Sequence, residues 1–67
     1  MIIFDNLWET MKKKRITKYA LIEKHYFSKT TLKRLKNNQN IETKTLNTLC
    51  KILDCELHDI AAFKKDD

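Results

Sequence analysis

The 67-residue sequence contains no glycine and no proline. Helix ends and turns must therefore be made by Asn, Asp and other polar residues, which adopt left-handed backbone more readily than most residues with a Cβ atom. Long hydrophobic runs are also missing, so we expect neither a membrane span nor a signal peptide. The length allows one domain, residues 1–67, close to the lower size limit for an unstapled hydrophobic core.

Cysteine is scarce, and its spacing does not fit a binding site. Cys50 and Cys55 have no third or fourth ligand at zinc spacing, and on one continuous helix they would lie on different faces. We therefore expect two reduced packing residues, no metal and a cytoplasmic location.

The net charge of +5 is unevenly distributed along the chain. Residues 12–36 carry ten basic side chains and one acidic side chain, Glu23, a net charge of +9, whereas residues 1–11 and 37–67 each carry −2. A merely solvated surface would mix the two signs more evenly. A basic middle between acidic ends indicates a nucleic-acid footprint on one face.

A helix-entry pattern occurs four times. Each instance has an apolar residue, a polar cap, and a second apolar residue five positions after the first, as in a hydrophobic staple. The four instances are Ile16, Thr17 and Leu21; Phe27, Ser28 and Leu32; Ile41, Glu42 and Leu46; and Cys55, Glu56 and Ile60.

These entries and the apolar spacing of the first helix predict an all-α domain of five short helices. Their expected ranges are residues 5–14, 18–25, 29–37, 43–53 and 57–61. Residues 1–4 and 61–63 are apolar enough either to pair as a small two-stranded ribbon, which we favour, or to pack on the core.

The segment TKYALIEKHYFSKTTLKRLK, residues 17–36, has the layout of a helix-turn-helix motif, which we take as residues 17–37. Inward positions fall on Leu21, Ile22, Phe27, Leu32 and Leu35. The second helix then presents a face suited to reading the DNA major groove, since Lys and Arg reach guanine acceptors and hydroxyls bond either kind of base edge. The candidate residues on and beside it are Ser28, Lys29, Thr30, Thr31, Lys33, Arg34 and Lys36.

Phosphate contacts are expected on both sides of that helix. Lys18 opens the preceding helix, where unpaired backbone N–H groups attract anions. The amide-rich loop that follows the reading helix, NNQN at residues 37–40, adds Asn37 and Asn40 as donors without strong nonspecific charge.

Over nearly its whole length the chain resembles the helix-turn-helix domain of the Cro and phage-repressor type, the XRE family. The resemblance is carried by YFSKTTLKRLKNNQNI and by the following ETKTLNTLCKILDCELHDI. It implies a phosphate contact at Lys18, base reading at Lys29, Thr30 and Lys33 or Arg34, and a backbone contact at Asn40. It also implies homodimers on two-fold symmetric operators, acting as repressors or occasionally as activators.

Two positions depart from the family pattern. Tyr26 stands in the motif turn, where Gly or Asn is usual. A left-handed conformation would cost Tyr about 1 kcal/mol or more, so we expect a different local path there. Asn38 replaces a frequent Gly after the reading helix and is expected to make a left-handed stop.

Other candidate sites have simpler interpretations. His25 and His58 lack partners for a metal or acid–base site, and Trp8 is expected to pack in the core. Tyr19 and Tyr26 fit either a phosphate contact or half-burial. The basic run at residues 12–15 ends the first helix, where cations favourably meet the helix dipole, and this role fits the run as well as a DNA contact does.

We therefore expect a sequence-specific transcriptional regulator that binds double-stranded DNA, with no catalysis, cofactor or small-molecule substrate. Any dimer is expected to use this same domain, with the apolar termini as candidate contacts. The alternative is a helical protein-interaction module, antitoxin-like or phage-encoded, that uses the acidic residues Asp54, Glu56, Asp59, Asp66 and Asp67.

Overall fold

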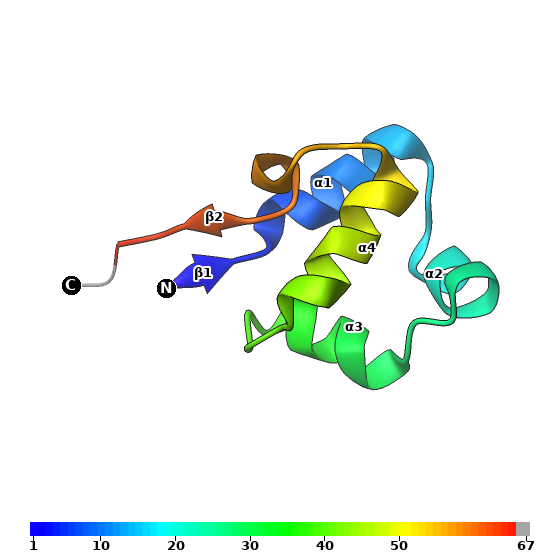
Figure 1. Cartoon of the computed structure of the whole chain (residues 1–67), viewed down its shortest axis with the longest axis horizontal. Helices are drawn as coiled ribbons and strands as arrows, with labels where there is room; N and C mark the ends of the chain where they lie inside the picture. The colour runs from blue at the N-terminus through cyan, green and yellow to red at the C-terminus, as the bar shows by residue number, and fades with distance from the viewer. Residues whose placement is uncertain (66–67) are drawn as a thin grey trace.

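The structure is a computed structural model that describes residues 1–65, with four α-helices, one turn of 3₁₀ helix and a two-stranded ribbon (Figure 1). Three of the α-helices have the bounds expected from the sequence, and the third ends one residue earlier than expected. None of the helices in residues 1–65 has both the length and the apolar character needed to cross a bilayer. The helices are α1 (Asp5–Lys14), α2 (Lys18–His25), α3 (Lys29–Lys36) and α4 (Thr43–Leu53).

One hydrophobic core joins these elements. α4 occupies the middle of the molecule and contacts α1, while α2 lies at the end opposite the ribbon and α3 runs below α4 in the view of Figure 1. All eight apolar residues of the four helix-entry pairs are in the core or pack against it. The side chains that are almost completely buried are Leu7, Leu21, Leu35, Leu49, Leu53 and Ile60.

The termini pair, as favoured from the sequence. β1 (Ile2–Ile3) is antiparallel to β2 (Ala62–Phe63), with Ile2 opposite Phe63 and Ile3 opposite Ala62. The backbone N–H of Lys64 extends the ribbon by donating to the Met1 carbonyl at 2.8 Å. Both strands of the ribbon therefore lie together on one side of the molecule (Figure 1).

The prediction of a fifth α-helix at residues 57–61 is wrong. In its place is η1, a 3₁₀ turn of three residues, Leu57–Asp59. Two of its hydrogen bonds span three residues, from the Asp59 N–H to the Glu56 carbonyl and from the Ile60 N–H to the Leu57 carbonyl, both at 3.0 Å. One bond of the α-helical type follows, from the Ala61 N–H to the Leu57 carbonyl at 3.1 Å. The chain must bury Ile60 and enter β2 at Ala62, so the helical hydrogen bonding does not continue beyond Ala61.

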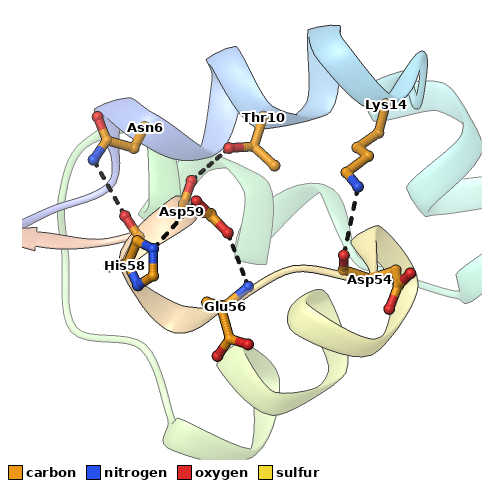
Figure 2. A network of polar contacts seen from close by, with 7 residues as sticks. All are labelled: Asn6, Thr10, Lys14, Asp54, Glu56, His58 and Asp59. Atoms are coloured by element: carbon orange, nitrogen blue, oxygen red, sulfur yellow. Dashed lines mark hydrogen bonds and ion pairs between the residues drawn. The ribbon is translucent and has the colours of Figure 1, made fainter.

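Polar contacts fasten η1 and the end of α4 to α1 (Figure 2). The Thr10 hydroxyl donates to the Asp59 carbonyl at 2.5 Å, and the Lys14 ammonium to the Asp54 carbonyl at 3.5 Å. At the start of η1, the N–H of the preceding residue Glu56 donates to the Asp59 carboxylate at 2.9 Å. These bonds satisfy backbone and side-chain groups that the absence of a regular helix would otherwise leave to water.

The two cysteines are neighbours, contrary to the expectation that they lie on different faces. α4 ends at Leu53, and Asp54 adopts a left-handed conformation with φ 49°, which turns the chain back so that the Cys55 N–H donates to the Cys50 carbonyl at 3.1 Å. Both thiols are free and half-buried. Burial is the main cause that raises the pKa of the Cys55 thiol, and the adjacent Cys50 is the second.

Candidate nucleic-acid interface

The start of α3 is fixed by a side-chain cap. Ser28 has extended backbone, and its hydroxyl accepts a hydrogen bond from the Thr31 N–H at 3.0 Å. The hydroxyls of Ser28 and Thr31 are also hydrogen-bonded to each other at 2.9 Å. Ser28 is exposed and Thr31 is half-buried, so both expected DNA-binding hydroxyls also define the first turn of the helix.

The outer face of α3 combines positive charge with a hydroxyl group. Leu32 and Leu35 are buried, which turns the other side of the helix outward. At helical spacing, Lys29, Lys33 and Lys36 form one row, and Thr30 and Arg34 lie in the next. The structure therefore places the expected base readers Lys29, Thr30, Lys33 and Arg34 on one exposed face of α3, and Lys36 is exposed at the end of the same face.

This positive charge is not neutralised within the described residues. Across residues 1–65, no carboxylate forms an ion pair with a lysine or arginine of α2 or α3, and the ion pair found there joins His58 to Asp59 at 3.6 Å. The α3 charges are therefore available to phosphates or base edges.

The turn between α2 and α3 corrects an expectation. Tyr26 does adopt the left-handed conformation, with φ 60° and ψ 30°, so the chain keeps the turn geometry that the family makes with Gly or Asn. The following Phe27 N–H reaches back to the Leu21 carbonyl at 3.0 Å, and the Phe27 side chain is buried. The Tyr26 side chain is 90% exposed, which excludes half-burial for this residue. Packing of Phe27 thus holds the neighbouring Tyr26 in a strained, left-handed conformation.

The start of α2 lies beside α1. Thr17 caps the helix, since its hydroxyl accepts from the Ala20 N–H at 3.0 Å. Lys18 is the first helical residue and is exposed, and its ammonium nitrogen lies 4.8 Å from the centroid of the Trp8 ring. Trp8 packs against the core, as expected, although it is only partly buried. This contact was not foreseen from the sequence, because it joins two helices.

The amide side chains in the loop after α3 have two different roles, one structural and one suited to phosphate contacts. Asn38 has φ 54°, the left-handed stop that was expected, and its side-chain oxygen accepts from the Phe4 N–H at 2.8 Å. Asn38 is therefore a structural residue that ties this loop to the end of β1. The expected phosphate donors Asn37 and Asn40 are exposed on either side of it.

Comparisons with known proteins agree with this geometry. The family model for the Cro/C1-type HTH DNA-binding domain matches residues 6–66. A crystal structure of the transcriptional regulator VanUg superposes with a TM-score of 0.86 at 26% identity, covering 97% of this chain and 87% of that chain. A search of curated proteins gives no match.

The resemblance expected from the turn, the reading helix and the following segment is thus confirmed. The chain belongs to the Cro/C1-type helix-turn-helix DNA-binding domains, a family of DNA-binding transcription regulators.

Proposed function

We propose that this domain is a repressor that binds a palindromic operator as a homodimer, with α3 in the major groove of each half-site. The observation that carries the proposal is the exposed face of α3, where four cations and the Thr30 hydroxyl lie side by side without acidic partners in residues 1–65. Lys29, Thr30, Lys33 and Arg34 read base edges in this arrangement.

The remaining site residues hold the helix in register on the phosphates. Lys18 contacts the backbone on one side of the groove, and Lys36, Asn37 and Asn40 contact it on the other. Ser28 and Thr31 approach the bases at the start of α3 while they keep its cap in place. No cofactor enters this function, and we place it in the cytoplasm.

Repression is the regulatory outcome that requires only occupancy of the operator. We place the dimer contact at the end of the molecule that carries the ribbon, away from α2 (Figure 1). Exposed apolar side chains support this choice, since Met1, Ile2, Leu57 and Phe63 are each about half or more exposed there. Such a concentration of exposed apolar groups is typical of a protein interface.

Selection of bound sequences from a random duplex pool, repeated at two salt concentrations, tests the operator. We expect an enriched inverted repeat with half-sites about 10 base pairs apart, or a multiple of the helical repeat. Binding that falls with salt but keeps its sequence preference supports regulation. No enrichment over nonspecific binding would contradict the proposal.

The double substitution Lys29→Ala and Lys33→Ala tests the docking of α3. Both side chains are exposed, so the fold should persist, while loss of two groove contacts should weaken operator binding by about tenfold or more. The matched control is Lys13→Ala with Lys51→Ala, which removes the same charge outside the motif and away from the ribbon. Equal loss in the two double variants would show that only net charge matters.

A second candidate function is a protein-interaction module. The exposed apolar groups around β1, β2 and η1 favour it. Of the acidic residues suggested for this role, the Asp59 carboxylate already accepts from the Glu56 N–H. Asp66 and Asp67 lie outside the described residues. Weak, sequence-blind DNA binding in the selection experiment would favour this function.

A further inference from the structure

Lys18 has a specific neighbour on another helix. Its ammonium nitrogen lies 4.8 Å from the centroid of the Trp8 ring, close enough for a cation–π interaction, which Trp makes more strongly than other aromatic residues. Trp8 is packed against the core and is therefore held in place, whereas Lys18 is exposed. Within residues 1–65, no carboxylate forms an ion pair with Lys18.

This contact restricts a side chain that is otherwise flexible. A lysine ammonium sits on a four-carbon stem and loses rotamer freedom when it is fixed. The ring occupies one side of the ammonium and leaves N–H donors available on the others. The ammonium is thereby held near the first turn of α2, where unpaired backbone N–H groups also favour an anion.

We propose that Trp8 is a positioning residue for DNA binding, which holds the Lys18 ammonium ready for a backbone phosphate. Trp8 acts on DNA only through Lys18 and reads no base. The inference rests on the proposed function, because it requires the phosphate contact of Lys18. It adds α1 to the elements that determine affinity.

A double-mutant cycle tests this coupling. The four proteins are the wild type, Trp8→Leu, Lys18→Met and the double variant, and Trp8→Phe is added as the conservative replacement. Binding is measured by fluorescence anisotropy on a duplex enriched from the random pool and on a mixed-sequence duplex of the same length, each over a range of salt.

Trp8→Leu should weaken binding about two- to five-fold, the effect of losing one exposed cation–π contact, with the salt slope unchanged. Lys18→Met should lower the salt slope by about one. Trp8→Leu should add nothing in the Lys18→Met background, and Trp8→Phe should retain most of the affinity. Equal effects of Trp8→Leu in both backgrounds would overturn the inference, because they would indicate a merely structural role.

A second measurement does not depend on core variants. Trp8 is the only tryptophan in the chain, so the fluorescence of the protein reports on the surroundings of this ring, which include the Lys18 ammonium. Addition of the enriched duplex should change the emission of the wild type and have much less effect on Lys18→Met. The same change in both proteins would overturn the inference.

The two proposals fail in different ways. If the wild type enriches no sequence and Lys29→Ala with Lys33→Ala binds normally, the proposed function fails. If the wild type binds an enriched sequence but Trp8 and Lys18 act independently, only the positioning role fails.

Discussion

Replacement of Tyr26 by glycine should stabilise the domain. Tyr26 is held at φ 60°, a region that costs an ordinary L-residue about 1–2 kcal/mol, and glycine enters it without that cost. Glycine loses about 0.5–1 kcal/mol more backbone entropy on folding than alanine. The ring is 90% exposed, so little apolar burial is lost. The net gain in the free energy of unfolding should be about 0.5–1 kcal/mol.

Thermal unfolding followed by far-UV circular dichroism measures this gain. An unfolding entropy of about 2.1 cal/mol/K per residue gives about 0.14 kcal/mol/K for 67 residues. Tm should therefore rise by about 4–7 °C in Tyr26→Gly. The same turn geometry is kept, so the motif should still bind DNA.

Tyr26→Ala is the matched control, because it removes the ring but keeps the Cβ atom. It should leave the free energy of unfolding within about 0.5 kcal/mol of the wild type. Tyr26→Asn should fall between the alanine and glycine variants, since Asn tolerates the left-handed region. If glycine and alanine changed Tm equally, the left-handed backbone could not be the cause, and the reasoning would be refuted.

Three further predictions concern the cap, the loop and a thiol. Ser28→Ala should lower the free energy of unfolding by about 1 kcal/mol in thermal melts by removing the cap of α3, whereas exposed Thr30→Ala should change it by less than about 0.5 kcal/mol. Asn38→Ala should cost about 1–3 kcal/mol in urea titrations, because it leaves the Phe4 N–H without its acceptor, and equal loss in Asn37→Ala would argue against this role. Burial and Cys50 raise the pKa of the Cys55 thiol, so the folded state favours the neutral thiol. The free energy of unfolding should therefore be at its full value below the ordinary thiol pKa and fall as pH rises through the raised pKa. Cys55→Ala should flatten this alkaline slope.

Local signals in the sequence predicted most of the fold. The staple pairs located the starts of α2, α3 and α4, because each pair depends on residues only five positions apart. The fifth helix failed on the same type of signal. Cys55, Glu56 and Ile60 do begin a helical turn, but the pairing of β2 with β1 ends it after Asp59. The pairing that limits this turn involves β1, at the other end of the sequence, so local spacing could not predict it.

In the candidate site, too, the features that depend on local spacing were predicted and those that join distant residues were not. Helical periodicity correctly placed Lys29, Thr30, Lys33 and Arg34 on an exposed face, because that face depends only on which residues of α3 are buried. Neither the Lys18–Trp8 contact nor the bond from Phe4 to Asn38 follows from local spacing.

The path at Tyr26 was also missed. Residue preference argues against left-handed backbone for Tyr, but burial of the adjacent Phe27 decides the conformation.

The ribbon has a consequence for the order in which the domain is made. β1 is translated at the start of this sequence, and its partner β2 follows about sixty residues later, so their pairing waits until Phe63 has left the ribosome. The motif at residues 17–37 depends on nearby caps and can begin to form while the rest is still being translated. A nascent chain stalled before β2 should therefore carry a partly formed motif together with an unpaired, apolar first strand, a state exposed to chaperones and proteases.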